Sequence, residues 1–115
     1  MKPTIIRIGN AAGFWGDNLD APRITAELGE LDYLTLEYLA ELTLSILAHQ
    51  RSKNPDAGFV SDVPLTVKSI LPSLIGKQRL KLVTNGGGMN PVGCAIATAK
   101  VLVDAGQPNL SLIHI

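Results

Sequence analysis

The sequence predicts an α/β fold, with a mostly parallel sheet flanked by helices in the Rossmann-like manner. Short apolar runs alternate with longer segments of helical period along the chain. Two loops rich in glycine each follow an expected strand. Hydrophobic residues make up 46% of the 115 residues, which is enough to form a core. Alternating strands and helices imply parallel pairing with right-handed crossovers.

The first quarter of the chain is expected to hold one strand and one helix. The strand is the apolar run 4–8, and a glycine-containing loop follows it at 9–17. Residues 20–28 have helical period. Pro22 fits the first turn of this helix, where its missing N–H would have no helical partner anyway, and Gly29 ends it.

The middle of the chain predicts a second strand and two helices. The strand is 31–36, and the helix 37–52 follows it directly. A second, weaker helical pattern covers 61–76, and we expect Pro72 to kink or end it. The helix 37–52 carries an apolar stripe formed by Leu39, Leu42, Ile46 and Leu47.

The last third contains the clearest helix signals. A third strand is expected at 79–84, and the helical pattern 90–106 follows it. Asn90 is a favourable N-cap and Gly106 a favourable stop. The final apolar run, 110–115, is a fourth strand candidate.

Composition excludes several classes of function. Ten basic and ten acidic residues balance, and no cluster of Lys and Arg marks a nucleic-acid or anionic-membrane partner. No apolar run approaches the roughly 20 residues that span a bilayer, and the N-terminus lacks a signal-peptide pattern. The single cysteine cannot form an internal disulfide, and no Cys/His spacing indicates a metal site. We therefore expect a soluble, cytoplasmic protein.

The end of the chain is apolar up to Ile115. This favours the interpretation that residues 1–115 are the N-terminal part of a larger α/β domain. The assignment of residues 107–115 is doubtful, and they could even be foreign to the natural sequence. The alternative is a short domain that closes on a final strand.

The loop 85–90, "NGGGMN", lacks side chains at three successive positions. A ligand or another chain segment could then approach its backbone N–H groups closely. Together with the N-terminus of the following helix, this would suit a phosphate or carboxylate. Neither Gly-x-Gly-x-x-Gly nor the Lys-Ser/Thr of a P-loop is present. A loop that simply needs positive φ values to turn tightly explains the glycines equally well.

The first loop holds two of the five aromatic residues, Phe14 and Trp15. They could stack on a ligand, or they could anchor the loop to the core, which we favour. Asp17 could act as a base or metal ligand, but a cap of the next helix is the more ordinary role.

Other reactive side chains have ordinary interpretations as well. Cys94 lies in the first turn of a helix, which lowers a thiol pKa, yet its small apolar neighbours favour a buried, inert thiol. Glu37 and Glu41 are one helical turn apart and could hold a cation, although a solvated face is more usual. His49 and His114 have no evident catalytic or metal-binding partner.

Four motifs in a fixed order resemble the opening of the acyclic terpene utilisation (AtuA) family. They read "RIGNAAGFWGD", "LDYLTLEYLAELTLSILA", "NPDAGFVSD" and "LVTNGGGMNPVGCA", and the resemblance covers about residues 5–105. The chain departs from the family pattern at Ala12, where Ser is usual, at Gly86, where Ala is usual, and at Leu44, where Met is usual. The segment after Gly106 also differs.

The resemblance implies a role in the breakdown of acyclic terpenoids such as citronellol and geraniol, a pathway that proceeds through acyl-CoA thioesters. It does not define a reaction, so whether the protein is an enzyme stays open, and it names no cofactor or metal. The implied partner is a small anionic or CoA-linked metabolite. The alternative is a non-catalytic subunit or scaffold that supports a partner enzyme such as a carboxylase, or a homo-oligomer.

The motif positions give the candidate site. Asp17 is the candidate acid or base, and Tyr38 and Glu41 are lesser candidates. The candidate substrate-binding residues lie in the two loops, which are expected to face each other across one pocket mouth, and they are Gly13, Phe14, Trp15, Gly16, Asn85, Gly87, Gly88, Asn90 and Pro91.

Overall fold

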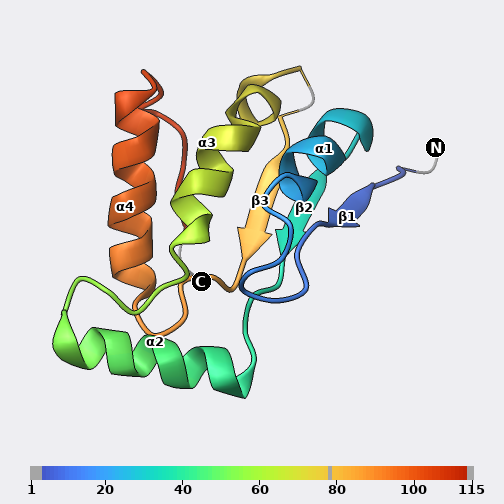
Figure 1. The fold of residues 1–115 in the computed structure, drawn as a ribbon. Coiled ribbons are helices and arrows are strands. Elements are labelled where there is room, and N and C mark those ends of the chain that lie inside the picture. Colours follow the sequence, from blue (N-terminus) through green and yellow to red (C-terminus); the bar gives the residue numbers. More distant parts are fainter. Residues whose placement is uncertain (1–3, 78, 114–115) are drawn as a thin grey trace.

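In the part of the chain that the structure describes, three parallel strands form one sheet in the order β1-β2-β3, accompanied by four helices (Figure 1). The computed structural model describes residues 4–77 and 79–113. The α/β prediction is confirmed. The strands are β1 (Ile8–Asn10), β2 (Tyr33–Leu36) and β3 (Lys81–Thr84), and the helices are α1 (Ala21–Leu28), α2 (Glu41–Lys53), α3 (Asp62–Ile75) and α4 (Pro91–Asp104).

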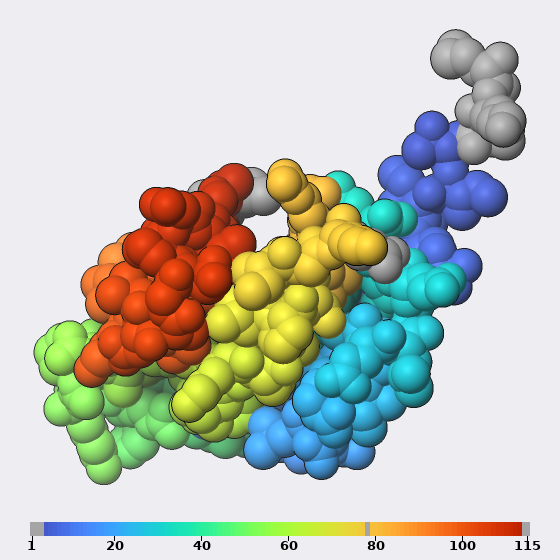
Figure 2. All heavy atoms as spheres, turned by 90° about the horizontal axis from the view of Figure 1, so that it is seen from above, coloured from blue at the N-terminus to red at the C-terminus, as the bar shows by residue number. Residues whose placement is uncertain are grey.

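The helices that pack on the sheet cover one of its faces. Strands that follow one another in order, joined by right-handed crossovers, bring their connecting helices to the same side. Helix α1 contacts β1, β2 and α3, and α3 contacts α4. Figure 2 shows α1, α3 and α4 side by side in this layer. On the opposite face the side chains of Ile8 and Val83 are 65% and 53% exposed.

The core lies between the sheet and the helix layer. Leu34 and Leu36 of the central strand are at most 1% exposed, and they meet Leu47 of α2 and Ile70 of α3 in one cluster. Helix α2 runs across the carboxyl ends of the strands in Figure 1, and Leu47 joins it to this core.

The strand register aligns the carboxyl ends of all three strands. Asn10 pairs with Thr35, and Thr35 pairs with Val83. The segments that leave the strands, 11–20, 37–40 and 85–90, therefore emerge at one edge of the sheet, as expected for a parallel arrangement.

Local signals predicted both ends of α1 and α4. Asp20 is the N-cap of α1, Pro22 lies in its first turn and Gly29 is its C-cap. Asn90 caps α4 by accepting a hydrogen bond from the Gly93 N–H. At the other end Gly106 has φ +75°. There the N–H groups of residues 106 and 107 donate to the carbonyls of 103 and 102, which is a Schellman motif.

The predicted start of the second helix was wrong. Helix α2 begins at Glu41, and residues 37–40 are not helical. Glu37 instead turns back to accept hydrogen bonds from the Leu39 N–H at 2.8 Å and from Asn85 Nδ2 at 2.7 Å. Glu37 and Glu41 therefore do not share a helical face. The apolar stripe was wrong as well, because Leu42 is 72% exposed.

Three further expectations differ from the structure. The first strand starts at Ile8 rather than at residue 4, because its pairing begins where Tyr33 supplies a partner. Pro72 does not end its helix, because α3 continues to Ile75, where Leu74 packs against the core and offsets the lost hydrogen bond, while a kink at Pro72 stays a prediction. Residues 110–113 form no strand, and the rest of that candidate, 114–115, lies outside the described residues.

Candidate functional site

Asp17 closes the β1–α1 loop on itself. Its carboxylate accepts hydrogen bonds from the Gly13 N–H at 3.0 Å and from the Asn18 N–H at 2.8 Å. These two backbone bonds lower the pKa of Asp17 below its ordinary value. Asp17 does not cap α1, whose N-cap is Asp20, so its clearest role is to fix the loop. A carboxylate with a lowered pKa is also a weaker general base.

The two aromatic residues of this loop point in different directions. Trp15 packs against the hydrophobic core, which favours the anchoring interpretation, whereas Phe14 is 57% exposed. Gly16 follows with φ +101°, a left-handed conformation that other residues adopt only with strain. The loop is thus held by Trp15 and presents Phe14 to solvent.

The β3–α4 loop is bare because its own chain packs against it. A Cβ on Gly88, which has φ +52°, would lie 2.5 Å from Leu47 of α2 and 3.1 Å from the Gly58 carbonyl oxygen. A Cβ on Gly87 would lie 2.9 Å from Pro91, and one on Gly86 would collide with Val63. Of the alternatives that the sequence left open, close approach of another chain segment is the one that the geometry favours.

Most N–H groups of this loop have partners within the protein. The N–H of Gly88 donates to Asn85 O at 3.1 Å, and that of Asn90 donates to Gly87 O at 2.9 Å. Met89 N–H donates to Gly58 O, also at 2.9 Å. An anion could bind these amides only by displacing those bonds.

The Asn90 side chain joins three segments. Its Oδ1 caps Gly93 at 3.0 Å, while its Nδ2 donates to Pro55 O at 3.1 Å and to Ala57 O at 2.9 Å. Asn90 is 8% exposed, and Pro91 follows it as the first residue of α4. All its polar atoms are engaged inside the protein, which makes it a structural residue.

Tyr38 stands between the two glycine-containing loops. Its ring lines a hollow beside Asp17, and on another side it would lie 3.1 Å from a Cβ on Gly86. Burial raises the pKa of the Tyr38 phenol, and the charges of Asp62 and Asp17 add to that effect. The nearby Thr66 hydroxyl has the opposite influence on this pKa.

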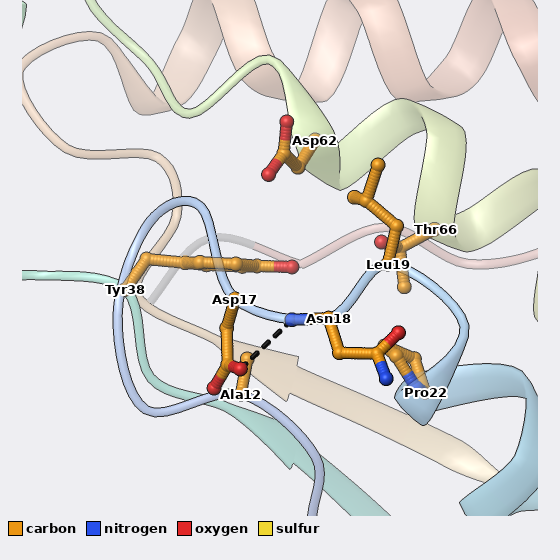
Figure 3. A pocket seen from close by; sticks show the side chains of 8 residues that line it. All are labelled: Ala12, Asp17, Asn18, Leu19, Pro22, Tyr38, Asp62 and Thr66. Atoms are coloured by element: carbon orange, nitrogen blue, oxygen red, sulfur yellow. Dashed lines mark hydrogen bonds between the residues drawn. The ribbon is translucent and has the colours of Figure 1, made fainter.

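The hollow beside Tyr38 lies between the β1–α1 loop and the N-terminal turns of α3 (Figure 3). It is too narrow to hold a water molecule. Its lining consists of Ala12, Asp17, Asn18, Leu19, Pro22, Tyr38, Asp62 and Thr66.

A second, larger depression lies at the carboxyl ends of the strands. This strand-end groove is open to solvent and offers about 490 Å³, within the range of about 300–1,000 Å³ that is usual for small-molecule sites. Each of the three strands contributes to it. Its lining residues are Asn10, Thr35, Leu36, Glu37, Val83, Thr84 and Asn85.

Hydrogen bonds fix the polar side chains of the groove. Asn85 Oδ1 accepts from the Tyr38 N–H at 2.9 Å, and its Nδ2 donates to Glu37 Oε1 at 2.7 Å. Across the groove, Thr35 Oγ1 donates to Asn10 Oδ1 at 2.8 Å. The groove therefore presents preorganised amide, hydroxyl and carboxylate groups.

Sequence reasoning found one residue of the groove as a candidate ligand contact, Asn85. It missed Asn10 and Thr35 as binding residues and considered Glu37 only as a helical partner of Glu41. A usable signal was present, because Asn10, Glu37 and Asn85 each end or follow an expected strand, where ligands of α/β folds bind.

Cys94 is buried in α4 and is a free thiol. Burial raises its pKa, and a hydrogen bond with Thr98 offsets this only in part. The prediction of an inert, buried cysteine is consistent with both observations.

Within 4–77 and 79–113, no group of three or more His, Cys, Asp or Glu side chains is arranged to hold a metal ion. No helix in the same described part of the chain has the length and apolarity needed to cross a bilayer.

A parallel sheet with its connecting segments and a polar groove at the strand ends defines the chain as an α/β protein of the Rossmann-like kind. The model of the acyclic terpene utilisation family protein AtuA matches residues 6–115, and the chain belongs to this family. The resemblance seen in the four motifs is thereby confirmed, and membership links the chain to acyclic terpene utilisation. Neither a curated protein nor a solved structure matches the chain.

Proposed function

We propose that the protein binds a small metabolite of acyclic terpenoid breakdown, of the anionic or CoA-linked type, in the strand-end groove. The observation that carries this proposal is the position of the groove at the aligned carboxyl ends of three parallel strands. The family supplies the metabolic context.

The lining suits a molecule with an apolar body and a polar group. Val83 provides apolar surface, and the amides of Asn10 and Asn85 offer hydrogen-bonding groups. Glu37 carries a negative charge at the same place. An anionic group would be repelled there, so we expect the acyl chain of the ligand near Glu37 and its anionic end on the Asn10 side.

The proposal differs in one respect from the expectation drawn from the motifs. The glycine loop 85–90 serves as a wall that positions Asn85 rather than as a cradle of backbone amides, because its amides bond within the protein. Asp17 fixes the neighbouring loop from the other side of Tyr38. A catalytic role for Asp17 has no support in this geometry.

A calorimetric titration tests the proposal with 3-methylbut-2-enoyl-CoA, free coenzyme A and 3-methylbut-2-enoate. We expect at least one of them to bind, and Glu37→Gln to tighten its binding about threefold to tenfold because a repulsive charge is removed. Glu41→Gln on exposed α2 is the matched control and should bind like the wild type. The absence of binding by all three compounds, or equal affinity of both variants, contradicts the proposal.

A second candidate function is a non-catalytic subunit that supports a partner enzyme. The observation that favours it is the uncovered face of the sheet, with Ile8 and Val83 exposed, next to the exposed Ile5 and Ile6. A stable complex with another protein of the pathway, combined with no response to the three compounds, would favour this role.

A further inference from the structure

One wall of the strand-end groove is formed by Asn85, which is followed directly by Gly86. Asparagine is a thermolabile residue, because the backbone nitrogen of the next residue can attack its side-chain amide and close a five-membered ring. A side chain on that next residue hinders ring closure, and glycine has none. Asn85 is the one asparagine of the sequence that precedes a glycine, and it is exposed, so that water reaches it.

The reaction open to this pair is deamidation, with water as the co-reactant. The Gly86 nitrogen gives up its proton and bonds to Asn85 Cγ, and the bond from Cγ to Nδ2 breaks. Nδ2 takes up a proton and leaves as ammonia. Water then opens the cyclic imide at one of its two carbonyls, which leaves aspartate or isoaspartate at position 85. No group is oxidised or reduced.

The native structure restrains the attacking nitrogen. The Gly86 N–H donates to Thr84 Oγ1 at 3.0 Å, and the Thr84 hydroxyl itself donates to Leu36 O at 2.8 Å. Gly86 is buried, and its carbonyl accepts from the Val60 N–H at 2.8 Å. The nitrogen therefore keeps both its proton and its position as long as these bonds persist.

The side-chain amide is restrained as well. Asn85 Oδ1 accepts from the Tyr38 N–H at 2.9 Å, and Nδ2 donates to Glu37 Oε1 at 2.7 Å. Ring closure needs the amide free to present Cγ to the Gly86 nitrogen, and the departure of Nδ2 breaks its bond to Glu37. The reaction thus requires local opening of the loop 85–90.

We propose that Asn85 is a deamidation site whose reaction is restrained by Thr84 and Glu37 and proceeds when the loop 85–90 opens. The product changes the groove. A carboxylate at position 85 has no N–H to donate to Glu37, and it places a second negative charge beside the first. The repulsion separates the segment 37–40 from the loop. The inference uses contacts within the protein and no ligand, so it does not rest on the proposed function.

The test is incubation of the whole chain at pH 8, native and in urea, followed by mass spectrometry of the peptide that contains Asn85. We expect the native chain to deamidate at least about tenfold more slowly than the chain in urea, because the reaction requires opening. Thr84→Val keeps the side-chain shape and removes the acceptor of the Gly86 N–H. This variant should react about threefold faster or more than the native wild type.

Thr35→Val is the matched control. It removes a threonine hydroxyl from the neighbouring strand, where that hydroxyl bonds Gly9 O and Asn10 Oδ1 rather than the loop 85–90, so its rate should equal that of the wild type. Glu37→Ala removes the partner of Nδ2 and serves as the second variant if Thr84→Val does not fold. The proposal is overturned if Asn85 gives no product in urea, if native and unfolded chains react equally fast, or if neither variant accelerates the native reaction.

Asn85→Asp tests the effect of the product. We expect it to lower the midpoint of urea unfolding by about 0.5 M or more, and Glu37→Gln in the same chain to restore most of the loss, because the glutamine amide can donate to the new carboxylate. Asn109→Asp adds the same charge at an exposed turn and should leave the midpoint unchanged. Equal midpoints for Asn85→Asp and the wild type, or no recovery with Glu37→Gln, would contradict the proposed effect on the groove.

Discussion

The ring of Tyr38 packs against the backbone of Gly86, so that a Cβ on Gly86 would lie 3.1 Å from Tyr38 Cδ2. The same Cβ would collide with Val63. Tyr38 follows β2 and Gly86 follows β3, and this contact therefore joins the two strand ends through side-chain packing. It also explains why a residue without a side chain stands at position 86.

Gly86→Ala is therefore expected to destabilise the protein by about 1–3 kcal/mol through overpacking. Gly86 does not have a positive φ, so backbone strain does not contribute. Urea unfolding measures the change. Gly13→Ala, whose nearest neighbour would be Asp17 Oδ2 at 3.8 Å, is the control and should change stability little.

A double-mutant cycle locates the source of that destabilisation. In a Val63→Ala background the collision is removed, and Gly86→Ala should then cost clearly less than in the wild type. Equal costs in both backgrounds would show that Val63 is not the residue that Gly86 accommodates.

Asn90→Ala is expected to cost about 2–4 kcal/mol. The substitution removes the N-cap of α4 and leaves the carbonyls of Pro55 and Ala57 without their donor. Ser61→Ala is a matched control, because Ser61 is the N-cap of α3 but makes no capping bond with its side chain. A loss below about 1 kcal/mol in denaturant unfolding would mean that Asn90 stabilises the protein through its capping bond to Gly93 alone. The bonds to Pro55 and Ala57 would then contribute nothing.

The ends of the helices could be predicted from sequence because they depend on neighbouring residues. Asn90 bonds Gly93 three residues away, and the left-handed Gly106 ends the same helix. The segment 37–40 could not be predicted in this way. Its departure from helix depends on Asn85, which is 48 residues from Glu37 and is brought near only by the pairing of β2 with β3.

The common edge at which the loops emerge was predicted, but the residues that line the groove were not. That the loops emerge at one edge follows from parallel topology alone, and this part is confirmed. No signal in the sequence indicated that Tyr38 would fill the space between them, or that Thr66 of α3 would be buried beside it. Both facts depend on how α3 packs over the first loop, which is a tertiary relationship.

Asp17 should make loop stability dependent on pH. Its folded-state pKa is lowered, so its contribution is present above the ordinary value of 3.8 and is lost as pH falls through the lower folded pKa. Asp17→Asn should be less stable than the wild type at pH 7, and the difference should shrink at pH 3. Asp20→Asn is the control, because Asp20 makes no side-chain cap bond. A difference that does not vary with pH would contradict the assigned carboxylate bonds.

Cys94 should react slowly with thiol reagents in the native protein. The thiol is 7% exposed, and burial raises its pKa, so both access and thiolate content are low. We expect alkylation by iodoacetamide at pH 8 to be at least about 100-fold slower than in urea, because it requires local opening. In a Cys94→Ala background, an introduced Ser45→Cys on exposed α2 supplies the fast-reacting reference. Comparable native rates would mean that the thiol is accessible.

Strand β1 is one of the two edge strands of the described sheet, and its outward side should promote self-association. The hydrogen bonds to β2 use Arg7 O and the Ala11 N–H, so the backbone groups of Ile8 point away from β2. Ile8 is also 65% exposed. An apolar edge with free backbone groups is a template for pairing with another chain, and a lysine at such a position blocks it. Ile8→Lys should therefore lower the concentration-dependent mass seen by light scattering.

Leu28→Lys, at an equally apolar and 78% exposed position on α1, introduces the same charge away from the edge. If it lowers the mass as much as Ile8→Lys does, net charge rather than the strand edge controls association.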